Sequence, residues 1–198
     1  MNLLVVSTWF PWPPDNGSRM RAFHLLREVA RRHRVSLLTF SDGDQPGASR
    51  VAALREFCQS VDAVAASPFR PGRLTRRGLL SPVPRAYAQG FSADMQARVD
   101  ARLAGHDAAI ALQVTAALYF RDVTALPVVF EEAEVAVIRD RFRSRSTVAG
   151  KVRSGLTWWK YARFVRDLSR RTARTTVVSE AERAILVDIG CDADRVAV

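Results

Sequence analysis

The chain of 198 residues is long enough to bury a sizeable core, and its 48% hydrophobic and 25% charged residues are typical of a soluble globular protein. Lys and Arg outnumber Asp and Glu by 30 to 20, so a formal charge of +10 attracts phosphates, nucleic acid or anionic lipid. No apolar run approaches the ~20 residues of a membrane span, and the first residues do not have the pattern of a secretory leader. The two cysteines suit a reducing compartment, so we expect a cytoplasmic protein.

The first third of the chain alternates short apolar runs with amphipathic segments. The patterns predict a strand over 2–6, a helix over 18–33, a strand over 35–40, a helix over 51–58 and a strand over 61–65. The next segment, 67–90, is rich in Pro, Arg and Gly and predicts a surface excursion with a short helix.

The same alternation continues to the C-terminus. Ser92 predicts the N-cap of a helix to about residue 103, followed by a strand over 107–112, a short helix over 115–121 and a strand over 127–130. The strongly basic segment 140–174 is predicted to be mostly helical. A strand over 176–178, a helix over 180–189 that ends at Gly190, and the start of a strand at 195–198 complete the chain.

The predicted strands are continuous apolar runs, which are typical of strands buried on both faces. Alternation of such strands with helices predicts an α/β fold, a doubly wound and mainly parallel Rossmann-like sheet with helices on both faces. The chain stops where a strand begins. We therefore expect residues 1–198 to form the N-terminal domain of a longer protein, truncated before a C-terminal domain.

The loop after the first strand is a candidate anion site. The carboxyl ends of parallel strands face the ligand crevice, and free N–H groups at a helix start attract anions, so Asn16, Gly17 and Ser18 are candidates to face a phosphate. These residues are equally typical of a plain turn with an N-cap. Arg19 and Arg21 oppose the helix dipole, which predicts that they meet an anion or a carboxylate elsewhere in the protein.

The same loop contains Trp9, Phe10 and Trp12 among three prolines, which indicates either packing or a wall for a sugar or lipid. One glycine instead of three excludes a dinucleotide fingerprint, and the loop has no P-loop lysine. A nucleotide-dependent epimerase or dehydrogenase is therefore disfavoured.

Further candidates follow the strand at 127–130 and occupy the basic segment. Glu131, Glu132 and Glu134 could bind a hydroxyl or act as a base, or they could form salt bridges with Arg139 and Arg141.

The basic segment contains a stripe of apolar residues at helical spacing: Val152, Leu156, Trp159, Val165 and Leu168. This stripe favours a helix packed on the sheet with a solvated basic face. The alternative is attachment to an anionic membrane. No metal-ligand spacing and no nucleic-acid-binding motif are present.

Four stretches together resemble the N-terminal domain of the GT-B-fold glycosyltransferases, specifically the retaining enzymes of family 4. They are LLVVSTWFPWPPDNGSRMRAFHLLREVARRHRVSLLTF, HDAAIALQVT, LPVVFEEAEVAVIRDRF and TARTTVVSEAERAILVDIGCDADRVAV. Arg21 and His33 match positions of that pattern. The chain departs from it where Asn16 replaces a second loop glycine, Gln113 and Ala133 stand where histidines are common, and Val165 replaces a glutamate.

The resemblance implies a domain that binds the acceptor, with Arg21, Gln113 and Glu134 as substrate-binding residues. The loop at Asn16, Gly17 and Ser18 would face the donor diphosphate, and a C-terminal domain would bind the nucleotide sugar. The catalytic residues stay unknown, with Glu132 and Gln113 as candidates, although a glutamine cannot act as a base near pH 7. No cofactor or metal is implied.

The expected function is transfer of a sugar from a nucleotide sugar to a hydroxyl of a polysaccharide, lipid-linked or small-molecule acceptor, by a retaining cytoplasmic enzyme. Such a role would belong to polysaccharide biosynthesis. Peripheral attachment at the inner face of the membrane is the alternative location. The fragment alone would be inactive, because half of the cleft is absent. The alternative is a non-catalytic Rossmann-like module that binds a phosphate-containing ligand, and nucleic acid is not an expected partner.

Overall fold

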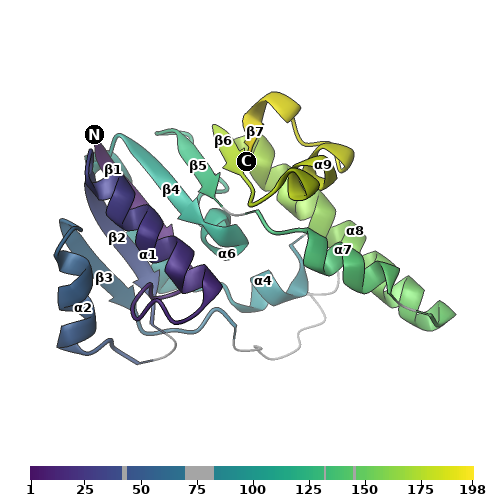
Figure 1. The fold of residues 1–198 in the computed structure, drawn as a ribbon, viewed down its shortest axis with the longest axis horizontal. Helices are drawn as coiled ribbons and strands as arrows, with labels where there is room; N and C mark the ends of the chain where they lie inside the picture. Colours follow the sequence, from purple (N-terminus) through teal and green to yellow (C-terminus); the bar gives the residue numbers. More distant parts are fainter. Residues whose placement is uncertain (42–43, 70–82, 132, 145) are drawn as a thin grey trace.

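A computed structural model describes residues 1–41, 44–69, 83–131, 133–144 and 146–198. Its centre is a seven-stranded sheet in the order β3-β2-β1-β4-β5-β6-β7, and every neighbouring pair of strands is parallel (Figure 1). The strands are β1 (Asn2–Ser7), β2 (Arg34–Phe40), β3 (Ser60–Val64), β4 (Ala108–Leu112), β5 (Val128–Glu131), β6 (Arg174–Thr176) and β7 (Val196–Ala197).

The helices connect successive strands across the two faces of the sheet. They are α1 (Gly17–Ala30), α2 (Ala48–Arg55), α4 (Arg85–Gln89), α5 (Ala93–Asp100), α6 (Gln113–Leu118), α7 (Ala136–Arg143), α8 (Val148–Arg171) and α9 (Glu180–Asp188), with short 3-10 turns at Leu103–Gly105 and Ala193–Arg195. Ser92 caps α5 as predicted, since its hydroxyl accepts from the Met95 N–H. Gly190 follows α9 with φ +91°, the left-handed conformation that ends many helices.

Each central strand is buried on both faces, as its continuous apolar run predicts. Leu4 and Val6 of β1 belong to one hydrophobic cluster, with residues of α5, α6 and α8, while Val5 belongs to a second cluster with α1 and α2. Alternate side chains of one strand therefore contribute to two cores. The predicted fold class, a doubly wound parallel Rossmann-like sheet covered on both faces, is confirmed.

Strand order reverses direction between β1 and β4. From β1 the chain moves outward to β2 and β3, and it then returns to add β4 to β7 on the other side. The loops after β1 and β4 consequently diverge from neighbouring strands at one edge of the sheet. In open parallel sheets this switch point is where ligands bind.

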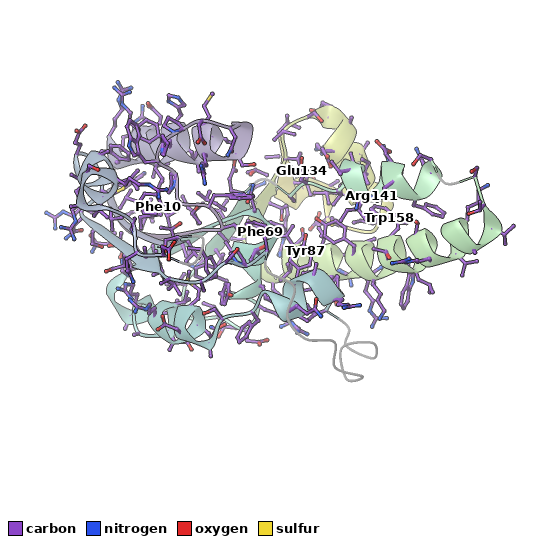
Figure 2. The ribbon with its side chains drawn as sticks, turned by 90° about the horizontal axis from the view of Figure 1, so that it is seen from below. Phe10, Phe69, Tyr87, Glu134, Arg141 and Trp158 are labelled. Carbon is purple, nitrogen blue, oxygen red and sulfur yellow. The ribbon has the colours of Figure 1, made fainter. Side chains whose placement is uncertain are left out.

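The basic segment 140–174, predicted to be mostly helical, contains the end of α7 and the whole of α8. α7 and α8 pack side by side and extend beyond the sheet (Figures 1 and 2), and we call this pair the arm. Gly155 permits the contact, because a Cβ added there would lie 3.3 Å from Cε2 of Phe142. The predicted packing of the apolar stripe on the sheet is wrong for its first half: Val165 and Leu168 are buried, whereas Val152, Leu156 and Trp159 are exposed.

Most other predicted boundaries differ from the structure by a few residues. β6 lies at Arg174–Thr176, two residues before the predicted strand, because its register is set by pairing Phe130 with Thr175. Of the expected excursion over 67–90, the structure describes 67–69 and 83–90, which include the short helix α4.

Candidate functional site

A cleft of about 380 Å³ opens at the carboxyl ends of β1, β4 and β5, at the topological switch point of the sheet. It is lined by Thr8, Trp9, Ser18, Pro68, Phe69, Ala86, Tyr87, Gln89, Gln113, Val114, Thr115, Glu134 and Tyr161. Figure 2 shows Phe69, Tyr87 and Glu134 gathered between the sheet and the arm. Polar amide, hydroxyl and carboxylate groups on aromatic walls are typical of small-molecule sites.

The aromatic residues of the first loop divide between packing and the cleft wall. Trp9 lines the cleft and stacks on Phe69, with ring centroids 4.2 Å apart. Phe10 is fully buried, and Trp12 packs against Phe23 at 5.3 Å. Phe10 and Trp12 therefore serve packing, whereas Trp9 forms part of the cleft wall.

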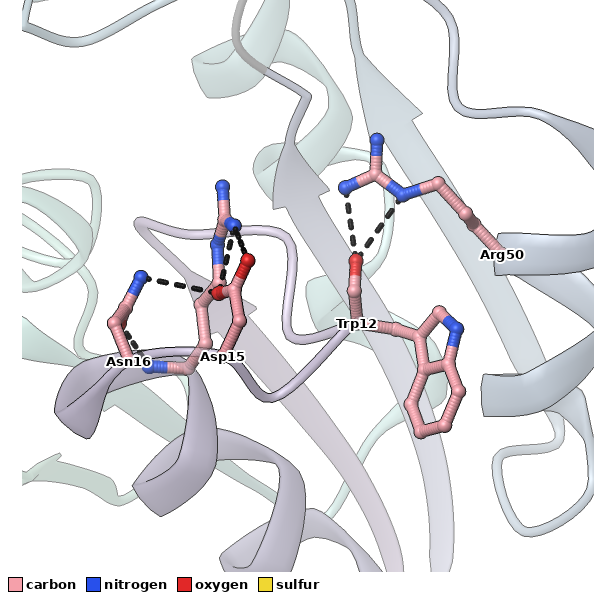
Figure 3. Close-up of polar contacts among 5 residues, drawn as sticks. Trp12, Asp15, Asn16 and Arg50 are labelled. Carbon is pink, nitrogen blue, oxygen red and sulfur yellow. Dashed lines mark hydrogen bonds and ion pairs between the residues drawn. The ribbon is translucent and has the colours of Figure 1, made fainter.

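Hydrogen bonds to backbone carbonyls fix this loop. The Trp9 carbonyl accepts from the hydroxyls of Ser7 (2.6 Å) and Thr39 (2.9 Å). The guanidinium of Arg50, on α2, donates from Nε (3.1 Å) and Nη2 (2.8 Å) to the Trp12 carbonyl (Figure 3). The backbone of the loop is thus held by side chains of β1, β2 and α2.

The predicted anion turn forms a capped start of α1 beside the cleft. Asn16 Oδ1 accepts from the Arg19 N–H at 3.0 Å, and Arg19 Nη1 pairs with Asp15 at 3.0 Å (Figure 3). Ser18 lines the cleft directly, whereas Asn16 and Gly17 lie on the adjoining exposed turn. No atom lies within 4 Å of a Cβ added to Gly17, so the packing of the fold does not require glycine there.

Arg21 meets a carboxylate of the protein, one of the two partners expected for it. Its Nε donates to Oε1 of Glu131 at 3.0 Å, and the Thr176 hydroxyl donates to the other oxygen, Oε2. Glu131 is only 7% exposed, and its charge is compensated by these bonds across α1, β5 and β6. Arg21 and Glu131 line a small cavity behind Gln113 and Trp9, so they support the cleft wall from within.

Gln113 lines the cleft and has an unusual backbone conformation. It begins α6 directly after β4 and has φ +72°, in the left-handed region that non-glycine residues avoid. The carbonyl of Leu112, the residue before Gln113, accepts from Thr8 Oγ1 at 3.0 Å. This hydrogen bond connects the turn at Gln113 to the first loop. Such strain persists where surrounding contacts hold it, and it concentrates at functional sites.

Glu134 belongs to the far wall of the cleft, together with two tyrosines. Its carbonyl accepts from the Tyr161 hydroxyl at 2.6 Å, and the rings of Tyr161 and Tyr87 stack with centroids 5.8 Å apart. Burial raises the pKa of Tyr87 and raises the pKa of Tyr161 more strongly. Both phenols are protonated at neutral pH, and the single O–H of Tyr161 is donated to the Glu134 carbonyl.

Glu182 positions this wall from α9. Its carboxylate accepts from the backbone N–H groups of Val135 (3.0 Å) and Ala136 (3.1 Å) at the start of α7. Ser179 caps α9 by accepting from the Glu182 N–H at 3.2 Å. Ser179 and Glu182 have the spacing of a capping box, but the Glu182 carboxylate accepts from the N-terminus of α7 instead of from its own helix.

Among the described residues, no ion pair joins Glu134 to Arg139 or Arg141, and Arg139 pairs with Asp140.

The structure places the predicted site residues unevenly. Ser18, Gln113 and Glu134 line the cleft, Arg21 lies behind it, Asn16 and Gly17 adjoin it, and Glu132 lies outside the described residues. Sequence reasoning missed Phe69, Tyr87, Gln89 and Tyr161. Tyr87 and Gln89 lie in the segment interpreted only as a surface excursion, so their spacing carried no signal.

Ionisable groups within the described cleft are limited to Glu134 and the two tyrosines. His33 lies near the opposite end of β1, and His106 Nδ1 is 2.6 Å from the Arg102 carbonyl. Among the residues that the structure describes, no group of three or more His, Cys, Asp or Glu could hold a metal ion. No described helix is both long and apolar enough to cross a membrane.

The fold is similar to that of HepE from Anabaena, whose solved structures include complexes with UDP, with UDP-glucose, and with UDP and glucose. In the complex with UDP and glucose the TM-score is 0.59 and the identity 16%, over 100% of this chain and 43% of HepE. The chain thus spans less than half the length of that protein. No protein-family model matches the chain, and no curated protein matches it.

Proposed function

We propose that the chain is the acceptor-binding part of a nucleotide-sugar-dependent glycosyltransferase with a GT-B fold. The observation that carries this proposal is the polar, aromatic-walled cleft at the switch point between β1 and β4. The similarity of the fold to HepE, a protein solved with UDP and glucose, supports it. A non-catalytic module that binds a phosphate-containing ligand is the alternative outcome of the experiment below.

In the proposed enzyme, the acceptor sugar lies in the cleft. The stacked pair Trp9 and Phe69 offers an apolar face, and the amide of Gln113 and the Tyr87 phenol offer hydrogen bonds to hydroxyl groups. Ser18 and the N-terminus of α1 face the donor diphosphate, since free N–H groups and the helix dipole stabilise an anion. The nucleotide itself lies on a second domain.

The proposed reaction retains the configuration at the anomeric carbon. The bond from this carbon to the diphosphate oxygen breaks, and a bond from the same carbon to the acceptor oxygen forms. The leaving diphosphate takes the proton of the acceptor hydroxyl. Pre-oriented donors around the diphosphate supply the stabilisation, a contribution that is worth about 3–4 kcal/mol per donor in other enzymes.

The experiment measures UDP release from UDP-glucose by the complete natural polypeptide, with and without a mixture of oligosaccharide and lipid-linked acceptors. Acceptor-dependent release is expected. Gln113→Ala and Trp9→Ala should lower it at least tenfold, the factor that corresponds to about 1.4 kcal/mol. Gln59→Ala, an exposed glutamine before β3, is the matched control and should leave the rate unchanged.

Nucleotide binding without release of UDP under any acceptor condition would favour the non-catalytic module. Loss of activity in Gln59→Ala as well would indicate a general defect in folding. A rate that is unchanged in both cleft variants would remove the cleft from the proposed site.

A further inference from the structure

The first half of α8 exposes a row of large apolar side chains. Val148, Val152, Leu156 and Trp159 are 79, 59, 58 and 57% exposed, although the second half of the same helix is buried against the domain. Their spacing of four, four and three residues places them on one side of the helix. A contiguous apolar row on a projecting helix is typical of an interaction surface.

Cations flank this row on both sides. Lys151 lies on one side of it, and Arg153 and Lys160 lie on the other. The guanidinium of Arg163 continues the row, 5.9 Å from the ring centroid of Trp159. From residue 141 to residue 166 the sequence has no Asp or Glu. The surface is therefore apolar and uniformly cationic.

An apolar groove of about 820 Å³ lies between this part of α8 and α4. Val152 and Leu156 form one wall, and Arg85 and Arg153 also line it, with no acidic residue in its lining. The groove shares Tyr87 and Tyr161 with the cleft described above, so the two openings adjoin. A ligand that covers the arm would therefore lie beside the mouth of the cleft.

We propose that the arm binds the surface of an anionic lipid bilayer. Val152, Leu156 and Trp159 enter the boundary between headgroups and acyl chains, and the flanking Lys and Arg side chains contact lipid phosphates. Charge complementarity selects this occupant. A second copy of the chain would oppose two cationic faces, and a nucleic acid would leave the apolar row in water.

The experiment is flotation of the chain with phosphatidylcholine vesicles, with and without phosphatidylglycerol. We expect about tenfold or greater recovery with the anionic vesicles, and its loss in high salt. The double variant Leu156→Glu with Trp159→Glu should abolish recovery, and so should Lys151→Glu with Arg153→Glu. All four positions are exposed, so the variants should retain the circular dichroism and Tm of the parent.

The matched control variants introduce glutamates in the same way at exposed positions outside the arm. Val187→Glu on α9 changes an exposed valine, and Arg32→Glu with Arg34→Glu changes two exposed cations between the end of α1 and the start of β2. Both controls should float like the parent. Brominated lipids should quench tryptophan emission in the parent, and Trp159→Phe should remove most of the quenching.

Equal recovery with both vesicle types, or arm variants that float like the controls, would overturn the proposal. So would a concentration-dependent dimer that Leu156→Glu disrupts without any vesicle binding, because it would assign the face to a second copy. Neither result bears on sugar transfer, which is measured separately.

Discussion

Gln113 combines a strained backbone conformation with a side chain that lines the cleft. Its φ of +72° turns the chain from β4 into α6, and the residue lines the proposed acceptor cleft. The cost of this conformation belongs to the folded state alone. Substitutions at this position can therefore separate stability from function.

Gln113→Gly should make the protein more stable and less able to bind an acceptor. Glycine adopts positive φ without the clash, so the free energy of unfolding should rise by about 1 kcal/mol relative to Gln113→Ala. Urea unfolding of both variants measures this difference. An alanine variant as stable as the glycine variant would show that the turn is not strained.

Gly17 is a glycine that the packing of the fold does not require, because there is room for a side chain there. Gly17→Ala should keep or slightly raise the Tm, since alanine is the better helix former. If the donor diphosphate approaches this turn, the KM for the nucleotide sugar should rise about tenfold, which corresponds to about 1.4 kcal/mol. An unchanged KM in the folded variant would separate the turn from the donor.

At the level of elements, Glu182 connects α9 to the start of α7. Glu182→Ala would leave two backbone N–H groups without their acceptor, those of Val135 and Ala136. The free energy of unfolding should fall by about 1–3 kcal/mol. Glu180→Ala, an exposed glutamate in the first turn of the same helix, is the control and should change it by less than about 0.5 kcal/mol. Equal losses in both variants would point to the helix dipole rather than the bridge to α7.

The sequence patterns predicted the elements and the sheet well, because apolar runs and helix caps are local signals. Ser92 and Gly190 mark helix ends in the sequence and in the structure. The lining of the candidate cleft was predicted less completely. Ser18, Gln113 and Glu134 follow strand ends, where the crevice of a parallel sheet lies, and all three line the cleft.

The remaining features depend on tertiary contacts that no local pattern encodes. Arg21 reaches Glu131 across 110 positions of the chain, and Tyr161 reaches the cleft from the middle of a long helix. The apolar stripe on α8 predicted burial along its whole length. The first half of α8 instead extends beyond the sheet, so its apolar side chains are exposed (Figure 1). Periodicity identifies an apolar face and not the surface that covers it.

For the whole molecule, the three tyrosines give a pH signature. Burial raises the pKa of Tyr87, Tyr119 and Tyr161 above the ordinary value near 10. Because the folded state holds these protons more tightly than the unfolded state, the stability that these tyrosines contribute should be constant below about pH 10 and be lost as the pH rises further. Absorbance at 295 nm should then increase together with loss of the folded circular dichroism signal. A phenol that titrates near pH 10 in the folded protein would contradict the buried environment of that residue.

A crystal structure of the complete natural polypeptide with UDP-glucose would examine the proposed ligand cleft most directly. We expect the diphosphate against the start of α1, near Ser18, and the glucose at the mouth of the cleft between β1 and β4, facing the acceptor position beside Gln113. A nucleotide sugar bound with no contact to this cleft would contradict the proposed function.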